Sequence, residues 1–159
     1  MKTVIPTLFL IVLCSFGLSS QAQNNGSSKL ERNIPLIVTE TFNNSYPAND
    51  AVWFSRYQGY NNQQLVYIAK FIFDNRYCHA SYTADGRQQA FAATVDRKEL
   101  PKGVTQYMKE NYPTFPIIEA LLVTDNKQQV TYEIGVYIDN DYVVFVFTEA
   151  GDFMRNTKA

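Results

Sequence analysis

Two neighbouring residues, Cys78 and His79, could act as a nucleophile and a general base. A reactive thiolate needs exposure and positive neighbours, and a catalytic histidine needs a partner within hydrogen-bond reach. The alternation of the surrounding strand places Cys78 on the apolar side of a sheet and His79 on the other side, beside Tyr77 and Ser81. We therefore predict a buried, inert thiol and a surface histidine, and no catalytic residue.

Acidic residues gather in predicted turns, where aspartate is common because its side chain hydrogen-bonds the nearby backbone. They are Asp74, Asp85, Asp125, Asp139, Asp141, Glu149 and Asp152. Asp139 and Asp141 could hold a calcium ion weakly, but no loop of calcium-binding spacing surrounds them. The sequence also contains no glycine-rich phosphate loop and no serine-nucleophile motif. We predict no metal site, no cofactor and no enzymatic activity.

The sequence segments that should form the helices and strands around these residues occur twice in the chain. Residues 34–47 return at 100–113, each copy ending in Tyr-Pro, and residues 67–75 return at 132–140. A period of about 65 residues is the size of a supersecondary unit that cannot bury a good core alone. The two copies should therefore pack together.

Each copy begins with a predicted helix. In the first copy Val38, Phe42 and Tyr46 recur every four residues, which is typical of the apolar face of a helix. Asn33 is the expected N-cap, and Pro47 should end the helix because it disfavours helical geometry at the residue before it. The second copy repeats this pattern.

Four extended segments follow each helix. They are expected at 51–58, 65–73, 76–83 and 87–95 in the first copy, and at 117–124, 130–139, 142–148 and 152–156 in the second. Asp-Asn and Asp-Gly turn signals separate several of them. We therefore predict an α+β fold of two tandem repeats, each one helix packed on a four-stranded antiparallel sheet, over residues 33–97 and 98–159.

Turn positions also predict the register. With Asp-Gly as a two-residue turn, Ala80 opposes Phe91 and Tyr82 opposes Gln89 on the side that the helix covers. The direction of Trp53 stays open, because its neighbours on both sides are also apolar and compete with it for the core.

The N-terminus has the pattern of a signal peptide over residues 1–22. A short positive start is followed by an apolar run and by Ser20-Gln21-Ala22, a small-x-small cleavage signal. The run is shorter than the roughly 20 residues that span a bilayer, so we expect no stable membrane insertion. Residues 23–32 are predicted to be a flexible lead-in. The mature chain should be periplasmic or secreted, with Cys78 as its only cysteine and no intrachain disulfide.

Composition narrows the choice of partner. Hydrophobic residues make up 46% and charged residues 18% of the chain, as in ordinary globular proteins. The formal net charge is −1 and no basic cluster is visible, which argues against nucleic acid as a partner.

The repeated pattern of a helix ending in Tyr-Pro, a Val-Trp strand at Val52-Trp53, long hairpins and a final turn with glycine resembles the β-lactamase-inhibitor-like, PepSY-like domain family of exported bacterial proteins. The resemblance covers residues 33–157. It implies a helix on a four-stranded antiparallel sheet, and a binding or inhibitory module with a hydrolase as a possible partner. The second copy departs from the pattern, since Ile118 or Glu119 stands where the tryptophan would recur.

The sheet face opposite the helices is the candidate binding surface. A solvated antiparallel face is usually polar, whereas this one mixes aromatic and aliphatic side chains with few charges, as protein-binding sites do. We predict that it binds an unidentified protein partner through Ile68, Ile72, Tyr77, His79, Tyr137, Tyr142 and Val144. The alternatives are that the other copy covers this face, or that a second chain does, as in a self-associating structural or assembly protein of the cell envelope.

Overall fold

The computed structural model describes residues 29–47, 49–59 and 63–158, so the predicted signal peptide and most of the lead-in lie outside the described residues. Within them, nine strands form one antiparallel sheet in which each strand pairs with the next along the chain. The strands are β1 (Lys29–Leu30), β2 (Val52–Gln58), β3 (Gln64–Phe73), β4 (Arg76–Thr83), β5 (Gln88–Thr94), β6 (Glu119–Asp125), β7 (Val130–Ile138), β8 (Asp141–Thr148) and β9 (Phe153–Lys158). The helices are α1 (Leu36–Ser45), α2 (Lys102–Asn111) and the short 3-10 helix η2 (Arg97–Glu99).

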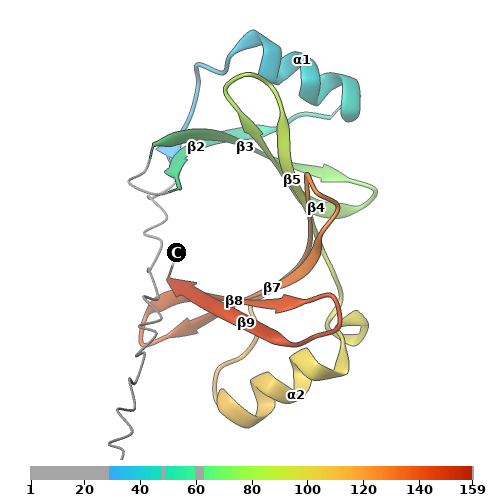
Figure 1. The fold of residues 1–159 in the computed structure, drawn as a ribbon, viewed down its shortest axis with the longest axis vertical. Helices are drawn as coiled ribbons and strands as arrows, with labels where there is room; N and C mark the ends of the chain where they lie inside the picture. The colour runs from blue at the N-terminus through green and yellow to red at the C-terminus, as the bar shows by residue number, and fades with distance from the viewer. Residues whose placement is uncertain (1–28, 48, 60–62, 159) are drawn as a thin grey trace, which may run out of the picture.

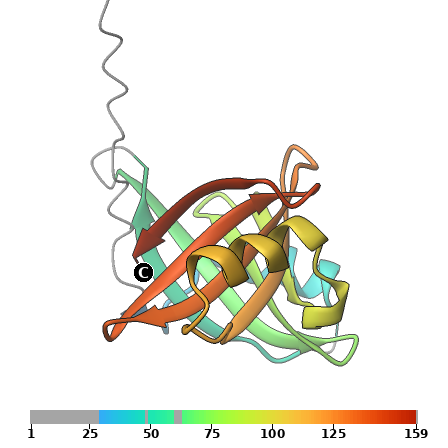
Figure 2. The ribbon, with the colours of Figure 1, turned by 90° about the horizontal axis from the view of Figure 1, so that it is seen from below.

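The sheet is strongly curved, and both long helices lie on its convex side (Figure 1). α1 packs on the half formed by β2 to β5, and α2 packs on the half formed by β6 to β9, as the view from below shows for α2 (Figure 2). The two halves join edge to edge through the pairing of β5 with β6. The predicted α+β fold of two helix-plus-strands units is therefore confirmed, with β1 as an additional strand beside β2.

The two long helices begin and end at equivalent residues of the two repeats. α1 begins directly after Pro35, whose carbonyl accepts hydrogen bonds from the Val38 and Thr39 amides at 3.0 and 3.2 Å. The N-cap is therefore Pro35, which makes no side-chain cap, and the prediction of Asn33 was wrong: the proline ring fixes the backbone angle φ near −55°, so the chain enters the helix at this residue. The helix ends at Ser45, immediately before the Tyr-Pro pair, as predicted. α2 likewise lies between Pro101 and a second Tyr-Pro pair.

Each helix buries one apolar stripe against its half of the sheet. Val38 and Phe42 of α1 are 0% and 2% exposed, and Phe42 packs edge-on against Phe71 with ring centroids 4.9 Å apart. Trp53, whose direction the sequence left open, points to the same core, since its ring lies 5.3 Å from that of Phe42. In the second half Val104 and Met108 of α2 pack with residues of β6, β7 and β8. The two cores are separate, each under its own helix.

The register of β4 and β5 differs from the prediction at one end. Ala80 pairs with Phe91 as predicted, but Tyr82 pairs with Gln88 instead of Gln89 because the register shifts between Ser81 and Tyr82. The cause is the turn, which is longer than two residues and ends in Gly86 at a φ of +85°. A left-handed glycine after a type I turn adds a bulge to the hairpin, and the bulge moves the pairing by one residue.

Replacing Tyr82 with phenylalanine should stabilise the protein. Tyr82 is 0% exposed, and its hydroxyl oxygen has no hydrogen-bond partner among the described residues. Because an unpaired buried hydroxyl is costly, Tyr82→Phe should raise the free energy of unfolding by about 1 kcal/mol. Urea denaturation measures the change. Tyr57→Phe, at a tyrosine that is 53% exposed, is the control and should change the free energy little. A loss of stability in Tyr82→Phe would show that the hydroxyl is bonded.

Candidate functional site

The side of the sheet opposite the helices is named the concave face here, and all the predicted binding residues lie on it. Their strand neighbours point into the two cores, so the alternation of the strands places their side chains on this face. Ile72 pairs with Tyr77 across β3 and β4, and Tyr137 pairs with Tyr142 across β7 and β8. The two pairs are equivalent in the two repeats, and each lies next to a hairpin turn.

The predicted residues differ in exposure. Ile72 is 59% exposed, Tyr137 55% and Tyr77 38%, whereas Ile68 is only 8% exposed. Tyr142, Val144 and His79 are half-buried. The floor of the face is apolar and buried although neither helix covers it; its buried side chains are Val66, Ile68, Ala92, Leu121 and Val146. The accessible apolar contacts are therefore the two hairpin pairs, and Ile68 supports them from below.

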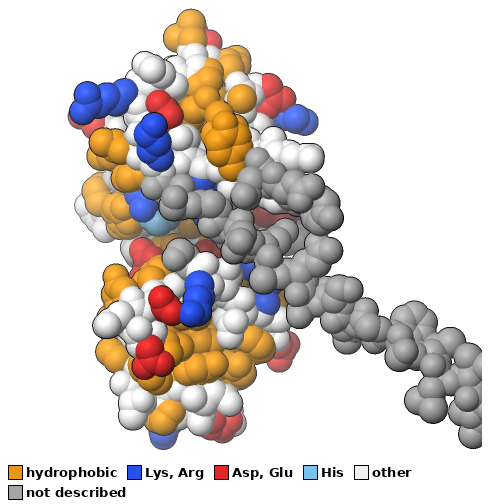
Figure 3. Space-filling model, turned by 90° about the vertical axis from the view of Figure 1, so that its left-hand side faces the viewer, with side chains coloured by type: hydrophobic (Ala, Val, Ile, Leu, Met, Phe, Trp, Pro, Cys, Tyr) orange, Lys and Arg blue, Asp and Glu red, His pale blue; other side chains and the backbone are white. Residues whose placement is uncertain are grey.

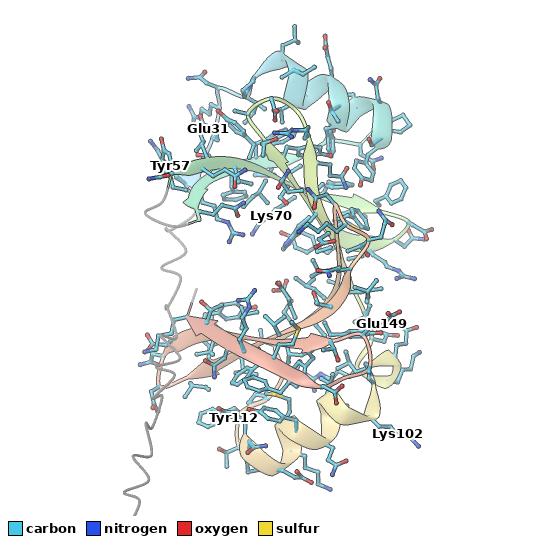
Figure 4. All side chains as sticks on the ribbon, in the orientation of Figure 1. Glu31, Tyr57, Lys70, Lys102, Tyr112 and Glu149 are labelled. Atoms are coloured by element: carbon cyan, nitrogen blue, oxygen red, sulfur yellow. The ribbon has the colours of Figure 1, made fainter. Side chains whose placement is uncertain are left out.

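Besides its tyrosines, the concave face carries charged side chains and the histidine. They are Arg56, Lys70 and His79 in the first half and Glu119, Glu133 and Arg155 in the second. Lys70 points into the space between the halves (Figure 4) and lies 4.8 Å above the Phe54 ring, a cation–π contact. The sequence-based description of this face as having few charges therefore understated its polarity. Strand alternation places each of these residues, but their convergence depends on the curvature of the sheet.

The two halves influence each other across this face. Burial raises the pKa of Glu133 in β7, while the positive charges of Arg155 in β9 and Arg56 in β2 oppose the rise. Arg56 and Glu133 are five strands apart in the sheet order, and the curvature of the sheet turns their two strands, β2 and β7, toward each other (Figure 1). The surface view onto the open side shows hydrophobic patches on both halves, with charged groups around them (Figure 3).

His79 was predicted to be a surface histidine, and it is half-buried instead. Its pKa is lowered, first by burial and then by the positive charges of Lys70 and Arg56, while the negative charge of Glu119 opposes the change. The Tyr77 ring packs edge-on against it with centroids 4.9 Å apart, and its Nε2 atom is buried without a partner among the described residues. A neutral histidine in this place packs as an aromatic ring and leaves one buried ring nitrogen without a partner among the described residues.

Tyr142 reaches across the sheet to Glu119. Its hydroxyl donates a 2.8 Å hydrogen bond to Glu119 Oε2, and its ring lies 5.3 Å from that of Tyr137 in a T-shaped contact. The pKa of Tyr142 is raised by burial and by the hydrogen bond to, and the negative charge of, this carboxylate. Glu119 and Tyr142 line a recess of about 510 Å³ between the end of β5 and the start of β6.

Among the described residues, no three His, Cys, Asp or Glu side chains lie close enough together to bind a metal ion. Asp141, considered above for calcium, forms an ion pair with Lys158. Cys78 is 1% exposed in the core under α1, as predicted, and burial raises the pKa of its thiol. No helix of the described part is long and apolar enough to cross a membrane.

Stability should depend on pH through Glu133. Burial raises the folded-state pKa of this carboxyl above its ordinary value of 4.5. The stability that Glu133 gains from binding its proton more tightly in the folded state is therefore fully present below pH 4.5 and is lost as the pH rises through the folded-state pKa. Glu133→Gln should therefore be more stable than wild type at pH 7, and the two should converge toward pH 4. Chemical denaturation across this range measures the difference. Glu149→Gln, at an exposed carboxylate, is the control; a difference that grew toward acid would contradict the assignment.

Solved structures share this architecture. A protein of Bacteroides eggerthii, whose name places it provisionally in the periplasm, matches with a TM-score of 0.63 at 17% identity over 80% of this chain and 90% of that one. A DUF2874 family protein of Bacteroides uniformis matches with a TM-score of 0.62 at 17% identity over 79% and 90%. A BLIP-like protein of Bacteroides fragilis matches with a TM-score of 0.57 at 15% identity over 81% and 89%. The sequence matches no family model and no curated protein.

At these identities the comparisons establish the fold. The resemblance to the β-lactamase-inhibitor-like family, predicted from the duplicated Tyr-Pro helices, is confirmed at that level. What the chain binds has to be argued from its own concave face.

Proposed function

We propose that this chain, which has the fold of BLIP-like and DUF2874 proteins, is an exported, non-catalytic module that binds a protein partner through its concave face. The observation that carries the proposal is the repeated pair of apolar and aromatic side chains on a continuous sheet, Ile72 with Tyr77 and Tyr137 with Tyr142, of which all but the half-buried Tyr142 are exposed. Tyrosine is enriched among the residues that dominate binding energy at protein interfaces. Exposed apolar patches flanked by polar groups are typical of such sites.

The build of the face supports a preformed site. The contact residues stand on paired strands above a buried apolar floor, and the cores behind them are closed by α1 and α2. Binding to a rigid surface avoids much of the entropy cost of ordering loops. The charged residues between the two pairs would add selectivity, since a wrong partner leaves buried charges unpaired.

A hydrolase is the partner class that we propose, with inhibition as the consequence of binding. The support is the fold shared with a protein named BLIP-like. Export is proposed from the pattern of residues 1–22 and from the provisional periplasmic name of one protein of this fold.

The test is capture of a partner by the mature chain from an envelope extract of its source cells, followed by titration of the purified pair. Tyr77→Ala and Tyr137→Ala should each weaken binding about 30-fold, the effect of losing an interface residue worth about 2 kcal/mol. Tyr57→Ala is the matched control, because Tyr57 is 53% exposed but lies on the other side of β2. If the control weakens binding as much, or neither face variant does, the concave face is not the site. A captured hydrolase whose rate stays unchanged at saturation would reject inhibition alone.

Self-association is the second candidate function, and the open edge of β9 favours it. Among the described residues β9 pairs only with β8, and its Met154 and Phe153 are 53% and 39% exposed. An unpaired strand edge is a template for pairing with another chain, although charged residues such as Arg155 and Lys158 protect against it. Light scattering at high protein concentration decides: a strict monomer removes this candidate.

A further inference from the structure

The recess beside Glu119 holds a carboxylate that no described cation neutralises. Ion pairs among the described residues join Arg87 with Asp85, Lys98 with Asp96, and Lys158 with Asp141. Arg97 also lines the recess, where its guanidinium donates to the carbonyl of Ile117 and forms no ion pair with Glu119. Among the described residues, the Glu119 carboxylate accepts a hydrogen bond from the Tyr142 hydroxyl, and its charge also acts on His79.

Aromatic rings surround this carboxylate from both repeats. Tyr142 bonds to Glu119 and Tyr137 packs against Tyr142. From the other repeat, Tyr77 lies near enough that the negative charge of Glu119 raises its pKa, after the larger effect of burial. An organic cation is attracted to such a site in two ways: by the negative charge of the carboxylate and by the electron-rich faces of the tyrosine rings.

Gly135 shows that this arrangement is built into the second repeat. It lies inside β7, between Glu119 and Val144 in the register, and it has no positive φ that a turn would require. A Cβ at this position would lie 1.9 Å from the Tyr142 hydroxyl oxygen, so only glycine lets the phenol cross the strand to Glu119. The equivalent position of the first repeat, 65 residues earlier, is Lys70.

We propose that Glu119, together with the rings of Tyr142, Tyr137 and Tyr77, receives a lysine or arginine side chain of the protein partner. The inference rests on the proposed binding role of the concave face and adds a chemical requirement: the partner presents a basic side chain to this recess. A guanidinium or ammonium group can donate to the carboxylate while packing on a ring. A metal ion would need more ligands than one carboxylate supplies.

The test uses small probes and the intact mature chain. Nα-acetyl-arginine methylamide and Nα-acetyl-lysine methylamide are titrated against ¹⁵N-labelled protein, with the amide signals of Glu119 and Gly135 as readout. The neutral isostere Nα-acetyl-citrulline methylamide is the ligand control. We expect saturable shifts with the two cationic probes and none with citrulline. Glu119→Gln should weaken binding about tenfold, because it keeps the shape and loses the charge partner. Glu149→Gln removes the same charge from a turn outside the concave face and should leave binding unchanged.

Gly135→Ala is the second variant, since it displaces the Tyr142 phenol without touching the carboxylate; it should also weaken binding of the arginine probe. Equal shifts with citrulline, or equal weakening by Glu149→Gln, would overturn the proposal, and so would a Glu119→Gln protein that binds arginine like wild type. If Tyr77→Ala abolishes binding of a captured partner but Glu119→Gln does not, the proposal that Glu119 receives a basic side chain is rejected. The proposed function of the concave face would then still stand. Saturable, Glu119-dependent binding of the probes supports the receptor whatever partner is captured.

Discussion

Phe145→Ala should lower the free energy of unfolding by about 4 kcal/mol, the typical cost of removing a fully buried phenylalanine and leaving a cavity. Phe145 is 0% exposed at the centre of the second core. Its ring centroid lies 4.6 Å from that of Tyr112 and 6.5 Å from that of Tyr107, so the side chain connects β8 to the middle of α2 and to the residue that follows its last turn. Helix packing in the second repeat depends on this ring.

The measurement also shows whether the two repeats unfold together. Trp53, the single tryptophan, lies in the first core, so its fluorescence reports on the repeat that the substitution does not touch. Because β5 and β6 pair along their lengths, we expect one cooperative transition, with the same shift by fluorescence and by circular dichroism. A fluorescence transition that stayed at its wild-type midpoint would show that the repeats unfold separately. Ile72→Ala, at a side chain that is 59% exposed, is the control and should change stability little.

Gly151→Ala should cost about 3 kcal/mol, from a strained backbone and from overpacking together. Gly151 adopts a φ of +93° in the turn between β8 and β9, and a Cβ there would lie 2.8 Å from Pro101 Cβ and 3.3 Å from the Val104 amide nitrogen. The turn therefore touches the first turn of α2 so closely that no side chain fits. The helix would have to move away from the sheet.

Gly59→Ala separates the two causes. Gly59 has a φ of +85°, similar to that of Gly151, but a Cβ there would meet nothing within 4 Å. It should cost about 1 kcal/mol, the backbone contribution alone. Thermal or urea denaturation of both variants gives the difference, which measures the close contact between turn and helix. Equal losses in the two variants would mean that the contact contributes nothing.

These two sites connect the fold to its proposed use. The contact residues of the concave face point away from the helices, whereas Phe145 and Gly151 contact the α2 side of the sheet and would not touch a partner. Variants of Phe145 or Gly151 should therefore weaken partner binding only in proportion to the unfolded fraction. Tyr77→Ala and Tyr137→Ala should weaken it in a folded protein.

The sequence by itself determined the local structure. Helix ends follow from the proline on either side, as at Pro35 and Pro47, because proline acts through its own backbone and its nearest neighbours. Strand alternation fixed which side chains share a face, and it placed Cys78 in the core and Tyr77 opposite the helix. The duplication predicted two similar units. All of these signals depend on residues a few positions apart.

Features that depend on contacts between residues far apart in the sequence were decided by the tertiary structure alone. The direction of Trp53 was settled by Phe42 on the helix above it, and the pairing of Tyr82 with Gln88 was settled by the bulge at the turn. The recess is a clearer case. Glu119 carried no local sign of a site, and its meeting with Tyr142 depends on the gap at Gly135 in the strand between them. Curvature of a sheet is the sum of small twists over all its strands, so no short segment predicts which side chains it brings face to face.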